Sequence, residues 1–147
     1  MMKQLLALFF VCAVRLGAQP APQPMSNPPS LDGTTWALMG HKTIFGSLTV
    51  QFVERAGENP EERQLGGTWS GSLFGCTGAE CQAHGTITGL RSGATVLFAL
   101  LPDAKGVLRG RTLETAVLTD STSMHGADMA SEAIRGDWTR KPARPKP

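Results

Sequence analysis

Hydrophobic and polar residues alternate along much of this chain with the period of two that is typical of β-strands. Residues 43–53 show the alternation most clearly. The apolar row of this segment is expected to contain Ile44, Leu48, Val50 and Phe52. Gly46 interrupts that row, which predicts a bulge or a bend there. One apolar face and one polar face indicate an antiparallel sheet whose outer side is in water.

Residues 67–90 are predicted to form the hairpin at the centre of the fold. Two rows of side chains are expected to share its inner face. They are Trp69, Gly71 and Leu73 on the first strand, and Gly85, Ile87 and Gly89 on the second. Cys76 and Cys81 flank the turn between the strands.

Further strands follow this hairpin, and a polar segment precedes it. Residues 94–101 read as a continuous apolar strand with Val96, Phe98 and Leu100 on one side. Leu97 and Leu101 on the other side predict cover from a loop, a terminus or a partner. Residues 134–139 are expected to place Ile134, Gly136 and Trp138 on one face, and residues 55–66 read as a polar surface loop.

The spacing of these segments predicts the fold class. The chain contains eight or nine candidate strands and no convincing helix. Regular strands of this length favour a sandwich or a barrel. We expect an all-β domain over residues 31–141, a single antiparallel meander that closes into a small eight-stranded β-barrel.

The first thirty residues predict export. Lys3, an apolar run over residues 5–14 and small residues after it have the form of a signal peptide over residues 1–18, cleaved near Ala18. The run is too short to span a bilayer. Phe9, Phe10 and Val11 precede Cys12, which argues against lipidation, because a lipobox has a small residue just before the cysteine. Residues 19–30 contain five prolines and read as an extended spacer outside the core. A secreted or periplasmic location is the expectation.

Charge excludes one class of partner. The full chain has 14 basic and 12 acidic residues. Loss of residues 1–18 removes Lys3 and Arg15 and leaves a net charge of zero. Nucleic acid is therefore not expected as a partner, since its binding requires a concentrated basic field. Residues 142–147 belong to a basic, proline-rich tail, which is expected to be extended and solvated; a weak contact with an anionic envelope surface is the alternative.

The cysteines that survive export allow two interpretations. A disulfide between Cys76 and Cys81 is the simpler one in an oxidising compartment. It would close a loop of six residues and fix the register of the hairpin. The alternative is a zinc site that adds His84, but this set offers three ligands at an unusual spacing. We expect the disulfide, no metal and no cofactor.

Each tryptophan lies close to a glycine near the start of a predicted strand. Glycine lets a strand bend sharply into a barrel wall, and the indole fills the barrel. Gly67-Thr68-Trp69 and Gly136-Asp137-Trp138 resemble the Gly-x-Trp motifs of calycin-like small barrels of the lipocalin and avidin type. The resemblance covers residues 31–141 and implies an eight-stranded meander with a closed sheet. Some secreted protease inhibitors of bacteria are similar in form, with one disulfide and an extended N-terminal arm.

The sequence contains no motif of an active site. There is no Gly-x-Ser-x-Gly elbow, because Thr68 stands where its first glycine would be. His41, His84 and His125 form no metal-binding pair, and His84 and His125 are expected on the outer face. We therefore do not expect an enzyme.

Two functions remain. The first is a non-catalytic binding barrel for a small apolar or amphipathic ligand. Its candidate site residues in the interior are Trp36, Trp69, Gly71, Phe98 and Trp138. Glycines on the inward faces would leave room for that ligand, namely Gly71, Gly89, Gly126 and Gly136. The second is a protein-binding module, such as an inhibitor or an envelope assembly factor, that uses the spacer, the segment 55–66 or the strand at Ala94. A roomy interior would favour the first function, and a filled interior with an apolar outer patch the second.

Overall fold

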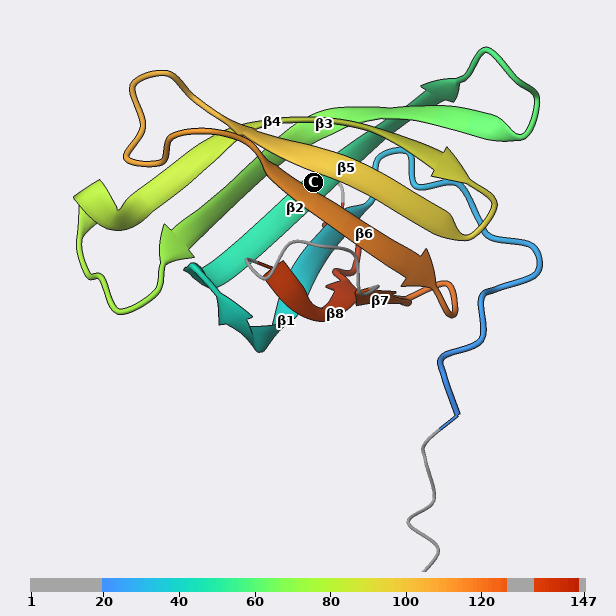
Figure 1. Cartoon of the computed structure of the whole chain (residues 1–147), viewed down its shortest axis with the longest axis horizontal. Helices are drawn as coiled ribbons and strands as arrows, with labels where there is room; N and C mark the ends of the chain where they lie inside the picture. The colour runs from blue at the N-terminus through green and yellow to red at the C-terminus, as the bar shows by residue number, and fades with distance from the viewer. Residues whose placement is uncertain (1–19, 127–133, 146–147) are drawn as a thin grey trace, which may run out of the picture.

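The chain folds into a closed, eight-stranded antiparallel β-barrel (Figure 1). The computed structural model describes residues 20–126 and 134–145. The strands are β1 Thr35–Thr43, β2 Phe45–Ala56, β3 Glu62–Leu73, β4 Gln82–Ser92, β5 Thr95–Pro102, β6 Thr112–Leu118, β7 Ser123–Gly126 and β8 Ile134–Arg140. Each strand pairs with the next, and β1 pairs with β8. The predicted fold class, an all-β meander barrel, is confirmed.

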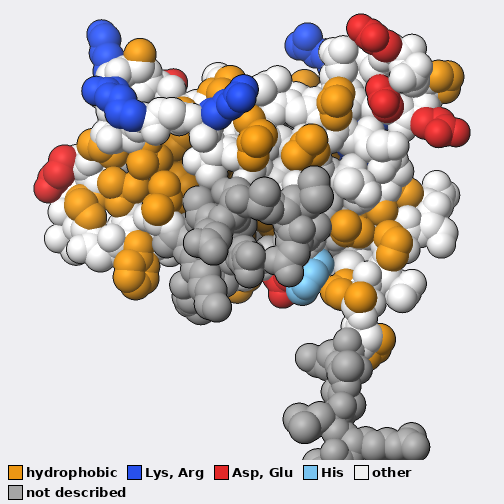
Figure 2. Space-filling model, viewed as in Figure 1, with side chains coloured by type: hydrophobic (Ala, Val, Ile, Leu, Met, Phe, Trp, Pro, Cys, Tyr) orange, Lys and Arg blue, Asp and Glu red, His pale blue; other side chains and the backbone are white. Residues whose placement is uncertain are grey.

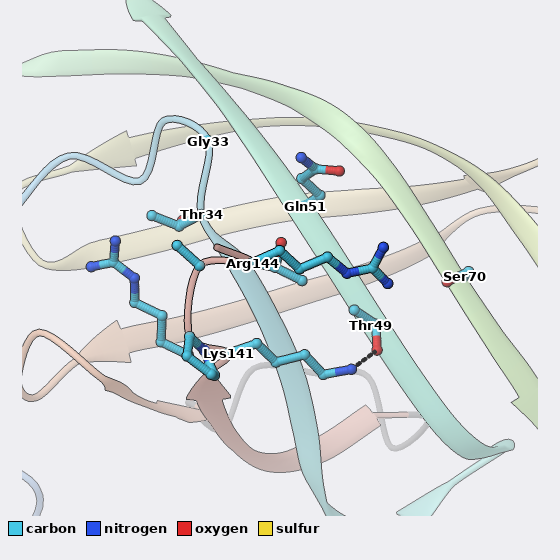
Figure 3. Close-up of a pocket in the computed structure, with 11 residues that line it drawn as sticks. Gly33, Thr34, Thr49, Gln51, Ser70, Lys141 and Arg144 are labelled. Carbon is cyan, nitrogen blue, oxygen red and sulfur yellow. Dashed lines mark hydrogen bonds between the residues drawn. The ribbon is translucent and has the colours of Figure 1, made fainter. Parts of the chain in front are cut away.

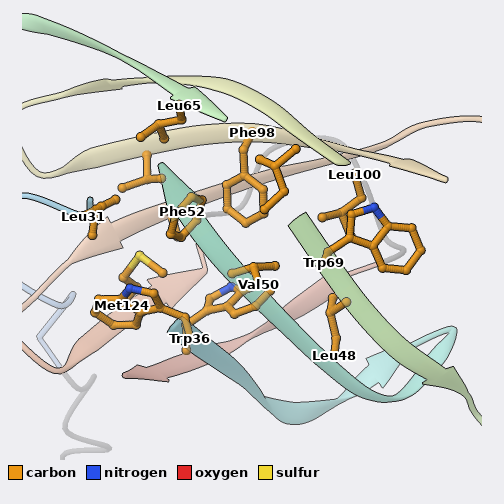
Figure 4. Close-up of a cluster of buried hydrophobic side chains, with 14 of the residues drawn as sticks. Leu31, Trp36, Leu48, Val50, Phe52, Leu65, Trp69, Phe98, Leu100 and Met124 are labelled. Atoms are coloured by element: carbon orange, nitrogen blue, oxygen red, sulfur yellow. The ribbon is translucent and has the colours of Figure 1, made fainter. Parts of the chain in front are cut away.

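In each strand, one of the two alternating rows of side chains points into the barrel, as the sequence pattern predicted. Leu48, Val50 and Phe52 on β2 are buried, as predicted. All three indoles are buried inside the wall, and each is at most 3% exposed. Rings from different strands meet edge to face, with centroids 5.2 Å apart for Phe52 and Phe98 (Figure 4). One continuous apolar core therefore holds the strands together.

Two glycines allow the wall to close around Trp69. Gly67 has a φ of 131°, and a Cβ atom there would clash with the backbone oxygen of Gln51. Gly85 is opposite Trp69 on β4, and a Cβ atom at Gly85 would clash with the carbonyl oxygen of Leu101. The indole nitrogen of Trp69 donates to that same oxygen at 3.2 Å. The glycines thus permit a close approach of neighbouring strands beside the Trp69 indole.

The start of β2 differs from the prediction. Ile44 is 45% exposed, and its neighbour Phe45 is buried. Phe45 pairs with Leu73, but Ser47 pairs with Ser72, so the register shifts at Gly46. The bulge predicted at Gly46 is therefore present. Because a bulge adds one residue to the strand, it moves the inward position from Ile44 to Phe45.

The predicted surface loop over residues 55–66 was too long. β2 continues to Ala56 and β3 begins at Glu62, so only residues 57–61 form the turn. Arg55 pairs with Gln64, and Ala56 pairs with Arg63. The polar residues Arg55, Arg63 and Gln64 can lie in strands because the ladder satisfies their backbone groups and leaves their side chains in water.

The N-terminal arm contacts one end of the barrel. Met25 is partly buried against the core, and its amide donates to the carbonyl of Leu118 at 2.8 Å. Leu31 is 1% exposed and belongs to the core itself. The expectation that the proline-rich spacer stays outside the core was wrong for Met25. An apolar side chain that can cover a barrel end loses water there, which favours the contact.

A buried ion pair lies at the same end. Arg91 on β4 donates to both carboxylate oxygens of Glu54 on β2, at 2.6 and 3.0 Å. The amide of Leu31 adds a third hydrogen bond to Glu54, at 2.9 Å. Burial would raise the pKa of Glu54, but the hydrogen bonds from Arg91 and Leu31 and the positive charge of Arg91 outweigh it and lower that pKa. The pair joins the arm to two strands.

The predicted leader, residues 1–18 with Cys12 and the cleavage site at Ala18, lies outside the described residues. In the part of the chain that the structure describes, no helix is long and apolar enough to cross a bilayer.

Candidate binding surfaces

The structure brings four of the five candidate site residues into the packed core. Trp36, Trp69, Phe98 and Trp138 are each at most 3% exposed. Phe98 contacts Trp138 with ring centroids 5.7 Å apart. The indole nitrogen of Trp36 donates to the hydroxyl of Thr34 at 2.9 Å. These side chains pack against one another and the strands around them.

The space left by the inward glycines is filled. A Cβ atom at Gly71, the fifth candidate, would lie 3.1 Å from the ring of Phe45. One at Gly89 would lie 2.8 Å from the Cβ of Phe98, and one at Gly136 would lie 2.9 Å from Leu38. Neighbouring side chains therefore occupy the room that the first functional hypothesis assigned to a ligand.

Glu114 is a polar exception within this core. It lies on β6, opposite Phe98 of β5, and is 3% exposed. Its Oε1 has no hydrogen-bond partner, and neither has the indole nitrogen of Trp138. Burial raises the pKa of Glu114 to about 9, so its carboxyl group is protonated at neutral pH.

An apolar groove lies on the outside of the wall, over β3 to β6. We call it the outer groove; it has a volume of about 490 Å³. Its most exposed apolar side chains, Leu90, Leu97 and Leu113, are 42–49% exposed. They are close together because Leu90 pairs with Leu97 and Ala99 pairs with Leu113. Phe98 is also among the residues that line the groove, but its side chain is only 1% exposed and belongs to the core.

One basic residue lines the outer groove, and two more precede it in the chain. Arg111 lines the groove, and Lys105 and Arg109 precede Arg111 in the turn between β5 and β6. Figure 2 shows hydrophobic side chains on the face over β5 and β6, with Lys and Arg side chains beside them. The cover predicted for Leu97 is not supplied by the described residues, since Leu97 is 42% exposed.

The cysteines form the predicted disulfide. Cys76 and Cys81 are bonded across the turn between β3 and β4, with Cα atoms 5.6 Å apart. Because both sulfur atoms are used in that bond, the zinc alternative with His84 is wrong for this structure. The described residues contain no group of three or more His, Cys, Asp or Glu side chains that could hold a metal ion.

Two of the three histidines lie on the outer face, as predicted. His84 pairs with Asp103 at 3.0 Å, and both side chains are at least half exposed. His125 pairs with Asp137 through Nδ1. The side chain of His41 lies outside the described part of the structure.

Three charged residues with buried side chains were not predicted from the sequence as site or core residues. Glu54 follows Leu48, Val50 and Phe52 in the inward row of β2. Arg91 follows Ile87 and Gly89 in the inward row of β4, and Glu114 precedes Ala116 and Leu118 in that of β6. Each of the three could have been recognised in the same way, because each is a charged residue at a position where the alternation predicts an inward apolar side chain.

The chain was also compared with known proteins. No protein-family model, no curated protein and no solved structure matches it.

Proposed function

We propose that this protein is an exported, non-catalytic module that binds another protein through the outer groove. The observation that carries the proposal is the combination of a filled interior with an uncovered apolar groove on the wall. Large apolar patches on a soluble domain commonly mark interaction surfaces. Leu90, Leu97 and Leu113 would lose their remaining water contacts when a partner covers them.

The position of the groove favours a protein over a small molecule. A small-ligand site commonly encloses 70–90% of its ligand, whereas this groove lies on the outer side of a sheet. A protein surface can cover such a groove and the polar residues around it, including Gln64 and Thr88. Arg111 on the border favours a partner that carries acidic residues beside its apolar contact.

The leader-like residues 1–18 and the disulfide support export. Kinship with calycin-like barrels is part of the proposal, supported by the meander and the two Gly-x-Trp motifs. The secreted inhibitors of similar form offer a precedent for a barrel that acts on a protein and not on a small molecule.

Site-specific photo-crosslinking in the compartment to which the protein is exported tests this proposal. A photoreactive residue at Leu97 should yield a discrete adduct with another protein. The same residue at Thr86, an exposed outward position on β4, serves as the control and should not. Leu97→Glu should abolish an adduct formed from Leu90 and leave the fold intact, because Leu97 is partly exposed.

Three outcomes would overturn the proposal. One is no adduct from Leu90, Leu97 or Leu113. Another is an adduct that contains only a second copy of the chain, which would make the groove a self-association surface. A third is tryptophan fluorescence that shifts on titration with small apolar ligands and is insensitive to Leu97→Glu, which would restore an interior ligand site.

A further inference from the structure

The C-terminal tail lies over a polar hollow on a different face of the barrel. The amide of Lys141 donates to the carbonyl of Thr35 at 2.8 Å, and the ammonium group of Lys141 donates to the hydroxyl of Thr49 at 3.3 Å. Lys141, the last residue of the predicted domain, therefore continues the pairing with β1, and residues 142–145 after it are exposed. Beneath the tail is a hollow of about 630 Å³, which we call the tail pocket (Figure 3).

Two cationic side chains, those of Lys141 and Arg144, extend over the tail pocket, and no carboxylate lines it. Arg140 is a third basic residue at the pocket, but it pairs with the buried Trp36, so its side chain belongs to the inward row of β8. The other polar side chains are neutral and come from β1, β2, β3 and the residue before β1; they are Thr34, Thr35, Thr49, Gln51 and Ser70. Figure 3 shows the side chains of Lys141 and Arg144 extended across the outer face of the barrel towards Thr49 and Ser70.

No acidic residue in the described part of the chain neutralises these cations. None of the three takes part in an ion pair with the described carboxylates. Asp32, near in sequence to Gly33 of the pocket wall, is directed elsewhere. Its carboxylate accepts from the amide of Glu54 at 3.0 Å and lines a separate hollow with Glu54.

The like charges of Lys141 and Arg144 over one hollow repel each other, and a bound anion would relieve that repulsion. A guanidinium group offers paired donors that match the oxygens of a phosphate group. The hydroxyl and amide groups of Thr49, Gln51 and Ser70 can hydrogen-bond to a polar body attached to it. The volume lies within the range of small-ligand pockets and exceeds what a bare phosphate needs.

We propose that the tail pocket binds the phosphate group of a small, hydroxyl-rich molecule, such as a sugar phosphate. Lys141 and Arg144 bind the phosphate, and the β2–β3 side chains hold the hydroxyl groups. This site uses the β1–β3 face and is independent of the outer groove over β3 to β6.

Titrations followed by NMR test the site. The purified protein is titrated at low salt with inorganic phosphate, with glucose 1-phosphate and with glucose. The amide signals of Thr49, Gln51 and Ser70 should shift with both phosphates and not with glucose. Arg144→Gln should weaken phosphate binding by about tenfold, since it removes a charged hydrogen-bonding group. Lys105→Gln removes the same charge from the β5–β6 turn and should leave binding unchanged.

Each outcome decides a part of the proposal. Tighter binding of glucose 1-phosphate than of inorganic phosphate supports a phosphorylated sugar as the ligand, and equal binding restricts the site to the phosphate group alone. The proposal fails if neither phosphate shifts these signals at millimolar concentrations. It also fails if Arg144→Gln and Lys105→Gln weaken binding equally, because binding would then follow overall charge.

Discussion

Glu114 offers the sharpest test of the energetics of the barrel. Its carboxyl group has a pKa of about 9 in the folded protein, raised by burial from an ordinary value of 4.5. Between these two values the unfolded chain releases a proton that the folded protein keeps. Stability therefore falls as the pH rises through this window, by about 1.36 kcal/mol per pH unit. The contribution is complete below pH 4.5 and lost above about pH 9.

The perturbation is Glu114→Gln, which keeps the shape of the side chain and removes its titration. At low pH the two proteins carry neutral side chains at this position and should unfold with similar free energies. At pH 7 the wild type should have lost about 3 kcal/mol of its free energy of unfolding, and the variant should have kept it. This value is about 1.36 kcal/mol per pH unit multiplied by the interval from pH 4.5 to pH 7. That is a large share of the 5–15 kcal/mol that is typical of a domain.

The assay is urea unfolding at pH 5, 7 and 8, monitored by the fluorescence of the buried indoles. The free-energy difference between Glu114→Gln and wild type should widen with pH. Glu61→Gln, a change at an exposed position in the turn between β2 and β3, is the matched control and should show no such trend. A difference that stays constant over this pH range would refute the reasoning, because Glu114 would then be ionised in the folded protein.

Three further predictions concern features of the fold. Replacing both Cys76 and Cys81 with serine should lower the free energy of unfolding by about 2 kcal/mol, the loop entropy of a six-residue closure, measured by urea unfolding. Arg91→Ala should cost about 3–5 kcal/mol at pH 7, because it leaves the Glu54 carboxylate buried without its partner. That loss should shrink below pH 4.5, the ordinary pKa of Glu54, as this carboxylate becomes protonated. Gly85→Ala should lower the free energy of unfolding by about 1–3 kcal/mol, because the added methyl group overpacks the wall. Gly66→Ala, where there is more space, is the control. The prediction is contradicted if Gly85→Ala lowers the thermal unfolding temperature less than Gly66→Ala does.

Much of the barrel followed from local pattern. Period-two alternation identified the strands and the inward positions of Leu48, Val50 and Phe52. A sheet with one face in water and one in the core has polar and apolar residues in strict alternation along each strand. The pattern gave the wrong prediction at Ile44. The bulge at Gly46 turns Ile44 outward and Phe45 inward. Both Ile44 and Phe45 are apolar, so composition could not distinguish them.

The candidate surfaces were harder to predict, because they depend on which strands are neighbours. Leu97 was recognised as a side chain on a second apolar face, but the groove exists only because Leu90 and Leu113 flank it on adjacent strands. The tail pocket depends on the tail pairing back onto β1, a contact across about a hundred residues. Local periodicity carries no information about such distant contacts.

The pairing of β1 with β8 sets the order in which this protein can mature. Trp36 is opposite Arg140, so the seam of the barrel joins the two ends of the domain. Contacts of such long sequence separation slow folding, and a chain that is still being synthesised lacks its last strand. Until then the backbone edges of β1 and β7 stay open to pairing with other chains. This topology therefore requires one of two conditions during folding. Either a chaperone covers the open edges, or folding is delayed until the whole chain is available.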